Sequence, residues 1–203
     1  MLKQKKQIKN LKTVIAVLGM AGSGKSETIN YLSRQTDWPK IYFGAATFER
    51  LKKEGLKINY HNERLIREKI RAELGMGAYA KLAMPKIKQA LKNSDTVILE
   101  SLYSWAEYLI LKKKFGPAFL TLAVYAPPAI RFKRLNSRDK ERPIKSRREF
   151  QERDYSEIEK TDKGGPIAIA DFTIINEGTC LDLRAKIARL IPKLRSQSFL
   201  IER

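Results

Sequence analysis

Short apolar runs alternate along this chain with longer stretches in which apolar positions recur three or four residues apart. The apolar runs are rich in β-branched and aromatic residues, and they lie at residues 13–18, 40–44, 96–100, 118–126 and 171–175. Runs that are apolar on both faces are typical of strands buried in a parallel sheet. Their alternation with helical stretches predicts a single α/β domain with a mainly parallel sheet.

Two polar segments interrupt this regular pattern. The first runs from Phe48 to Asn93 and is helix-rich, with breaks expected at Gly55, Gly75, Gly77 and Pro85. The second, residues 136–149, contains little apolar material. We therefore expect residues 136–149 to lie outside the core.

Composition narrows the classes of partner. The 203 residues suffice for one domain with a sizeable core. A formal net charge of +19 predicts attraction to anions, among them nucleotides, phosphorylated substrates, nucleic acid and acidic membrane surfaces. The charge indicates only the sign of the partner, and a generally basic proteome would explain it equally well.

The single cysteine and the N-terminal segment indicate in which cellular compartment the protein is expected. Cys180 is the only cysteine, which excludes an intramolecular disulfide and favours a reducing cytoplasm. The basic segment 1–12 leads into the first strand and then into a glycine-rich loop, so we interpret it as a tail and not as a signal peptide. No uncharged stretch has the length of a membrane span. We expect a cytoplasmic protein without a membrane partner, and the sequence leaves its oligomeric state open.

The glycine-rich loop carries the most specific motif. Its spacing is G-x-x-x-x-G-K-S, from Gly19 to Ser26, between an expected strand and an expected helix. Small residues let backbone N–H groups approach a polyphosphate, and the helix N-terminus aims its dipole at the same anion. Lys25 would bridge the β and γ phosphates, and Ser26 would ligate Mg²⁺. The alternative is a chance match in an ordinary strand–loop–helix turn. The candidate residues for holding ATP are Gly19, Ala21, Gly22, Ser23, Gly24, Lys25, Ser26 and Glu27.

An acidic residue ends the third expected strand. Glu100 would lie at the carboxyl edge of the sheet, where ligands of open α/β sheets bind. A carboxylate there would hold the Mg²⁺ shell or take a proton from an attacking hydroxyl. Alternatively, Glu100 caps the helix expected from Ser104.

An arginine-rich run follows the fourth expected strand. Guanidinium groups suit phosphate oxygens and charge that develops on a transferred phosphoryl group. The run predicts either a lid that closes over ATP or a solvated charged face offset by neighbouring acids. Its members are Arg131, Arg134, Arg138, Arg142, Arg147, Arg148 and Arg153.

Taken in order, these motifs make the chain resemble the nucleoside monophosphate kinase-like group of P-loop kinases, and within it the dephospho-CoA kinases and their archaeal relatives. The segments that carry the resemblance are "GMAGSGKSE", "GMGAYAKLAMPKIK", "VILES", "APPAIRFKRL", "EFQERD" and "ADFTIINEG".

The resemblance implies a three-layer P-loop NTPase fold with a five-stranded parallel sheet. It implies one domain over residues 1–203, with a helical acceptor-binding region at 45–94 and an arginine lid at 136–153. It also implies that Arg138 and Arg142 belong to the lid and that Asn176 lies near the adenine.

We therefore expect an ATP- and Mg²⁺-dependent phosphotransferase that acts on a nucleotide-like acceptor. Catalytic roles are expected for Lys25, Glu100 and the lid arginines. Arg71 is the candidate for binding an anionic group of the acceptor, and its alternative is a surface arginine paired with Glu68.

Two other functions stay open at this point. The charge and the lysine-rich tail fit a nucleotide-dependent nucleic-acid-binding protein or an RNA-directed kinase. Ala45 and Ala46 stand where such kinases usually carry an aspartate, which fits an ATP-binding regulator without kinase turnover.

Overall fold

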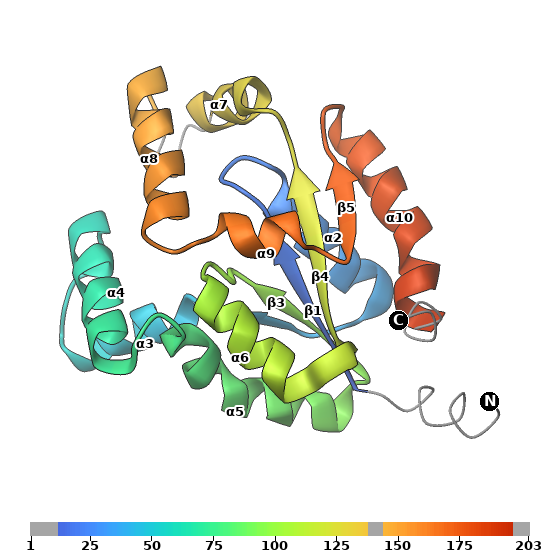
Figure 1. Ribbon diagram of the computed structural model, residues 1–203, viewed down its shortest axis with the longest axis horizontal. Coiled ribbons are helices and arrows are strands. Elements are labelled where there is room, and N and C mark those ends of the chain that lie inside the picture. The colour runs from blue at the N-terminus through green and yellow to red at the C-terminus, as the bar shows by residue number, and fades with distance from the viewer. Residues whose placement is uncertain (1–11, 138–143, 197–203) are drawn as a thin grey trace.

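The computed structural model describes residues 12–137 and 144–196, without the side chain of Tyr60. Its sheet has five parallel strands in the order β2-β3-β1-β4-β5 (Figure 1). The strands are β1 (Thr13–Leu18), β2 (Lys40–Tyr42), β3 (Thr96–Glu100), β4 (Phe119–Tyr125) and β5 (Phe172–Ile175). The predicted parallel α/β sheet is therefore confirmed.

Helices fill the connections between the strands. The described elements are α2 (Lys25–Thr36), α3 (Ala45–Lys53), α4 (Tyr60–Leu74), α5 (Ala78–Asn93), α6 (Trp105–Phe115), η1 (Gly116–Ala118), α7 (Pro128–Asn136), α8 (Arg147–Glu159), α9 (Gly164–Ala168) and α10 (Cys180–Ser196).

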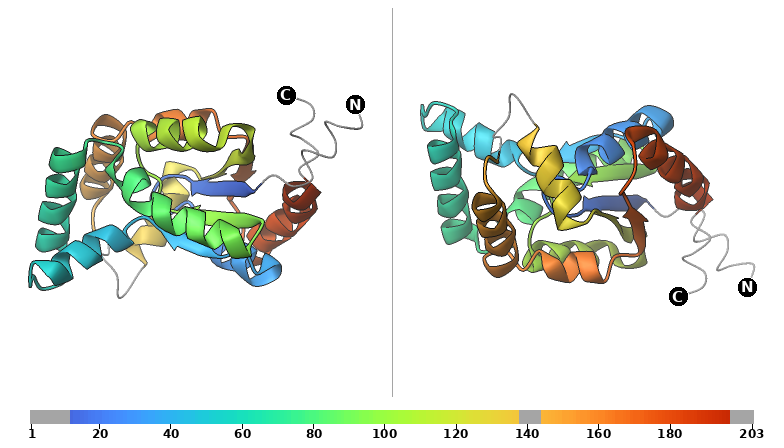
Figure 2. Two further views of the ribbon diagram at one scale, coloured as in Figure 1. Left: turned by 90° about the horizontal axis from the view of Figure 1, so that it is seen from below. Right: turned by 90° about the horizontal axis from the view of Figure 1, so that it is seen from above.

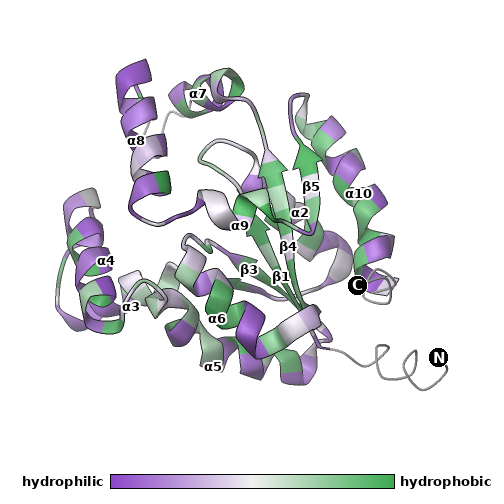
Figure 3. Cartoon of the chain, in the orientation of Figure 1, coloured by the Kyte–Doolittle hydropathy of each residue, from purple (hydrophilic) through white to green (hydrophobic). Residues whose placement is uncertain are grey.

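The alternation of side chains along β1 explains the three layers. Val14 and Ala16 face one apolar core, which α3, α4, α5 and α6 complete, whereas Ile15 and Val17 face a second core with α2 and α10. Figure 2 shows α6 on one side of the sheet and α2 and α10 on the other. In Figure 3 the strands are apolar, whereas α4 and α8 are largely polar. Both faces of the sheet are therefore buried, as the unbroken apolar runs predict.

The parallel register brings the carboxyl ends of the strands to one edge. Glu100 of β3 pairs with Val17 of β1 and with Tyr42 of β2, and Leu18 pairs with Ala123 of β4. The glycine-rich loop after β1 and the residues that follow β3 and β5 therefore lie at this edge.

Pro85 does not break its helix, contrary to the prediction. α5 runs through Pro85, although proline removes one backbone hydrogen bond. Ala83, Ile87 and Leu91 of the same helix are buried in the core. Burial of this apolar face outweighs the local cost of the proline.

The prediction that residues 136–149 lie outside the core is wrong at Ile144. This side chain is 2% exposed and packs with Ala21, Leu135 and Phe150 in a small third cluster. The segment reaches this cluster because α7 and α8 flank it. A single apolar residue in a polar stretch carries no periodic signal, so sequence pattern could not find it.

Among the described helices, none combines the length and the apolar character needed to cross a bilayer.

Candidate functional site

The loop after β1 is a backbone cradle. Gly19, Gly22 and Gly24 have φ values of +141°, +80° and +108°, a region that favours glycine. A Cβ at Gly19 would lie 2.3 Å from the Val124 carbonyl oxygen, and one at Gly22 would lie 2.8 Å from that of Arg131. Side chains are thus excluded at these positions both by conformation and by space. We call residues 19–24 the phosphate loop.

Lys25 begins α2 directly after the phosphate loop. Its ammonium donates a hydrogen bond to the Met20 carbonyl at 2.9 Å, so the side chain folds back over the loop. Burial lowers the pKa of Lys25 well below its ordinary value, and the positive charge of Lys163 lowers it further. The hydroxyl of Ser23 is buried and has no hydrogen-bond partner among the described residues. An anion in the loop would satisfy the desolvated ammonium, so the site fits a nucleotide phosphate.

Asn176 and Arg134, which follow β5 and β4 in the chain, fix the phosphate loop by hydrogen bonds. The Asn176 amide donates to the Ser23 carbonyl at 2.7 Å, and its oxygen accepts from Arg134 at 3.3 Å. Arg134 also donates to the Gly178 carbonyl at 3.2 Å. Asn176 is only 4% exposed. It therefore positions the loop, and its proximity to an adenine stays a prediction.

Arg131 is a structural arginine and not a free lid residue. Its guanidinium forms a two-pronged ion pair with Asp154 at 2.9 and 2.6 Å. It also donates to the carbonyls of Ala126 and Ala21, at 3.0 and 3.3 Å, and lies 4.9 Å over the Phe150 ring. Because Ala21 belongs to the phosphate loop, Arg131 joins that loop to α7 and α8.

Four charged groups influence the Lys25 ammonium, two of them on α8. Lys163, Glu157, Arg153 and Arg131 all act on its pKa. Glu157 is ion-paired with Lys163 and, at 3.5 Å, with Arg153. Burial raises the pKa of Glu157, but the positive charges of Lys163, Lys25 and Arg153 together outweigh this effect and the pKa is lowered. The buried Lys163 also lies 4.5 Å over the Tyr103 ring. A positively charged group of side chains therefore adjoins the phosphate loop.

Sequence reasoning missed Lys163 and Glu157. Neither lies in a motif, since "TDKGG" has no recognisable pattern and Glu157 is one of several acids on α8. They meet Lys25 only because the turn after α8 returns the chain to the sheet edge, where the Trp105 N–H donates to the Thr161 carbonyl at 3.3 Å.

Glu100 lies where the strand-end prediction puts it. It is half-buried at the end of β3, and its carbonyl accepts a hydrogen bond from the Phe43 N–H at 3.0 Å. The next residue, Ser101, has a φ of +73°, an uncommon value for a residue with a side chain. α6 is capped by Ser104 and Glu107 in a capping box, so Glu100 is not its cap.

Arg71 is not the surface arginine of the alternative interpretation. Glu68 is ion-paired with Arg64 at 2.9 Å. The Arg71 guanidinium lies 5.6 Å over the Tyr79 ring, and its buried Nε has no hydrogen-bond partner in the part of the chain that the structure describes. The nearby Glu107 is buried, which raises its pKa, and Arg71 partly counters this effect. Arg71 is thus a half-buried cation with unused hydrogen-bonding capacity.

The remaining candidates divide into three groups. Ser26 is exposed on the first turn of α2, beside the phosphate loop. Glu27 accepts a hydrogen bond from Arg184 of α10 at 2.7 Å, so it ties α2 to α10. Arg138 and Arg142 lie outside the described residues.

Two further arginines of the arginine-rich run interact with nearby side chains. Arg147 lies 5.5 Å over the Phe132 ring, and Arg148 pairs with Glu152 at 2.9 Å.

Known structures share this architecture. A shikimate kinase from Acinetobacter baumannii superimposes with a TM-score of 0.56 at 22% identity, covering 93% of this chain and 97% of that chain. A dephospho-CoA kinase from Campylobacter jejuni does so with a TM-score of 0.54 at 15% identity, covering 90% and 97%. At these identities the likeness concerns the fold, which is that of the P-loop kinases.

Sequence comparison gives the family. A family model described as "AAA domain" matches residues 15–160. The UPF0200 protein of Thermococcus kodakarensis is 31% identical over 91% of this chain and 99% of its own length. That of Thermococcus sibiricus is 34% identical over 89% and 95%. The resemblance to P-loop kinase-like proteins is therefore confirmed, and the chain belongs to the UPF0200 family of proteins with an AAA-type P-loop domain.

Proposed function

We propose that this protein is an ATP- and Mg²⁺-dependent phosphotransferase acting on a small, nucleotide-like acceptor. The observation that carries the proposal is Lys25, whose desolvated ammonium is held over the phosphate loop by the Met20 carbonyl. A lysine in this state gains most from a bound anion, because the anion replaces the lost hydration.

The donor half of the reaction follows from the loop. Its backbone N–H groups and the N-terminus of α2 would bind the phosphate chain, with Lys25 reaching toward the terminal phosphates. Ser26 would be a Mg²⁺ ligand, since its exposed hydroxyl lies on the first turn of α2. ATP would supply the phosphoryl group, and Mg²⁺ would neutralise part of its charge.

The cations near Lys25 would favour transfer. Lys163 and Arg153 both act on Lys25, and they share the carboxylate of Glu157. Three cations and one carboxylate leave an excess of positive charge beside the loop. Prearranged charge of this sign stabilises the negative charge that builds up during phosphoryl transfer.

Two residues would act on the acceptor. Glu100, at the end of β3, would orient or deprotonate the attacking hydroxyl. Arg71 would bind an anionic group of the acceptor through its unpartnered Nε. Arg71 lies on α4, within the β2–β3 connection that is proposed to bind the acceptor, and Glu100 lies at the end of β3, which follows that connection.

The test is ADP formation from ATP and Mg²⁺ across a panel of acceptors. The panel holds dephospho-CoA, each nucleoside monophosphate, deoxynucleosides and short RNAs. Lys25→Ala should lower acceptor-stimulated turnover at least about a hundredfold, whereas Lys113→Ala, at an exposed lysine of α6, should leave it unchanged. Stimulation that survives in Lys25→Ala would contradict the assignment.

The same panel separates the alternatives. Tight ATP binding with no stimulation by any acceptor would favour a regulator without turnover, in line with Ala45 and Ala46 at the start of α3. The comparisons give no support to a nucleic-acid function, and residues 1–11 of the lysine-rich tail lie outside the described part of the chain. Stimulation by RNA alone would be needed to revive that alternative.

A further inference from the structure

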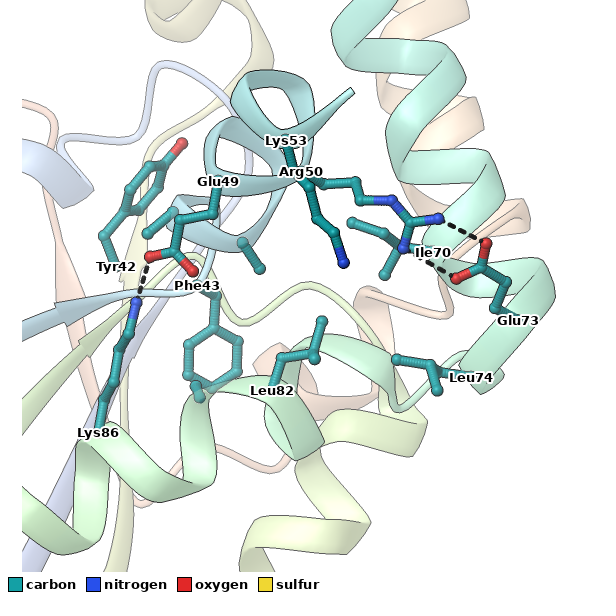
Figure 4. Close-up of a pocket in the computed structure, with 13 residues that line it drawn as sticks. Tyr42, Phe43, Glu49, Arg50, Lys53, Ile70, Glu73, Leu74, Leu82 and Lys86 are labelled. Atoms are coloured by element: carbon teal, nitrogen blue, oxygen red, sulfur yellow. Dashed lines mark hydrogen bonds and ion pairs between the residues drawn. The ribbon is translucent and has the colours of Figure 1, made fainter. Parts of the chain in front are cut away.

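A cavity of about 240 Å³ opens between α3, α4 and α5, away from the phosphate loop (Figure 4). Its floor and walls are apolar, and its rim carries charged side chains. Among residues 12–137 and 144–196, none that follows β3 lines the cavity, and neither does the phosphate loop. Pockets for drug-sized ligands measure about 300–1,000 Å³, so this one suits a smaller molecule.

The cavity lies within the helical region at 45–94 that is proposed to bind the acceptor, but on a different face of α3 from Arg71. Ala46, Glu49 and Lys53 line the cavity and recur on one stripe of α3. Thr47 and Leu51 are buried on a different face, and the Thr47 hydroxyl lies 2.8 Å from that of Tyr79. Since Arg71 stacks on Tyr79, α3 presents one face to the Arg71 side and another to the cavity.

Most charged groups on the rim neutralise one another. Arg50 pairs with Glu73 through two hydrogen bonds of 3.1 and 2.9 Å. Glu49 pairs with Lys86 across the opposite side of the opening. These two pairs join α3 to α4 and α5, and they leave no net charge.

Lys53 is the exception. Figure 4 shows its side chain extending into the cavity between the two ion pairs. It has no ion-pair partner among the residues that the structure describes. The cavity therefore presents one uncompensated positive charge above an apolar floor.

The apolar lining is partly open to solvent. Phe43, Ile70 and Ala83 are buried at the base, at 2%, 3% and 6% exposure. Leu74 and Leu82, on facing walls, remain 38% and 40% exposed. Covering these side chains would remove apolar surface from water, which favours a ligand with a compact apolar body.

We propose that this cavity binds a small monocarboxylate with a compact apolar body, its carboxylate paired with Lys53 and its apolar part between Leu74 and Leu82. This site is separate from the phosphate loop and does not depend on the proposed phosphotransferase activity. A single net positive charge favours a singly charged anion, and a cavity of about 240 Å³ suits a molecule smaller than a drug-sized ligand.

The test uses benzoate as the probe and benzamide and benzylamine as its uncharged and cationic counterparts. Backbone amide shifts are followed by NMR on the full chain. Benzoate should bind saturably in the millimolar range and shift α3, α4 and α5, with benzamide weaker and benzylamine not binding. Shifts confined to the phosphate loop, or equal binding of benzoate and benzamide, would overturn the proposal.

Two substitutions in the cavity and one control substitution make the test specific. Lys53→Gln should weaken benzoate binding about tenfold, the value of one charge-assisted contact. Lys52→Gln removes the same charge from the neighbouring exposed position, which does not line the cavity, and should leave binding unchanged. Ala46→Leu fills the cavity without changing its charge and should abolish binding. Benzoate binding that is insensitive to Lys53→Gln and Ala46→Leu would contradict the site.

Discussion

The Asn176 side-chain amide donates a hydrogen bond to the backbone carbonyl of Ser23 at 2.7 Å, across 153 positions of sequence. Arg134 fixes the other end of that amide at 3.3 Å. The residue after β5 therefore holds the phosphate loop after β1 in place, through a contact that the loop's own sequence does not contain.

Replacing Asn176 should loosen the loop. Asn176→Ala leaves the Ser23 carbonyl without its buried partner, which should lower the free energy of unfolding by about 1–3 kcal/mol and weaken ADP binding. Urea denaturation and calorimetry measure the two effects. The control is Asn93→Ala at an exposed position, which should change stability by less than about 0.5 kcal/mol. Equal effects of the two variants would show that the Asn176 contact contributes nothing.

Adding one methyl group should distinguish the loop glycines from an ordinary glycine. Gly24 has a φ of +108°, and a Cβ there would lie 2.4 Å from the Asn176 Nδ2. Gly24→Ala should therefore abolish ADP binding and lower the melting temperature. A Cβ at Gly164 has no atom within 4 Å, so Gly164→Ala should preserve both. ADP binding by Gly24→Ala as tight as that of the unmodified protein would contradict the rigid loop.

The pair of Arg131 and Asp154 should show strong coupling. Arg131→Leu leaves the largely buried Asp154 carboxylate without its partner, which should lower the free energy of unfolding by about 3–5 kcal/mol. Adding Asp154→Leu should recover part of the loss, because no unpaired charge then remains. A double variant less stable than Arg131→Leu in urea denaturation would exclude this account.

Glu107 should make stability depend on pH. Burial raises its pKa, so ionisation costs more free energy in the folded chain than in the unfolded one. Its contribution is most favourable below the unfolded value of about 4.3 and declines as the pH rises through the raised folded value. Glu107→Gln removes this decline.

The stability of Glu107→Gln relative to the unmodified protein should therefore increase from about pH 4 to pH 7. Urea denaturation at several pH values measures the difference. Glu159→Gln, at an exposed position of α8, is the control and should show no such trend. A relative stability of Glu107→Gln that falls as the pH rises would reverse the assigned sign.

Lys25 should link ADP binding to protons. Burial lowers its pKa, and a bound phosphate would favour the charged ammonium and raise it again. ADP affinity should therefore fall as the pH rises through the lowered value, with proton uptake on binding. Titration calorimetry between about pH 7 and 10 measures both. Lys25→Arg, which keeps its charge over this range, should show a flatter profile; an equally steep one would assign the proton to another group.

The sequence predictions were accurate where a feature depends on neighbouring residues and inaccurate where it depends on residues far apart in the sequence. The phosphate loop and Glu100 were placed correctly, since each depends on a few adjacent residues. Pro85 and Ile144 were placed wrongly, because packing against distant helices decides their environment. The hydrogen bond between Glu27 and Arg184 of α10 could not be predicted either, because the two residues are far apart in the sequence.

The sequence by itself determined the succession of strands and helices along the chain and the conformation of the phosphate loop. Hydrophobic periodicity and glycine spacing act over short stretches of chain. Only the tertiary structure decided which charged groups surround Lys25 and that Asp154 pairs with Arg131. It also decided that Lys53 has no ion-pair partner among the described residues. Those contacts join residues that are far apart in the sequence and that come together when the two faces of the sheet are buried. A local sequence pattern does not indicate such contacts.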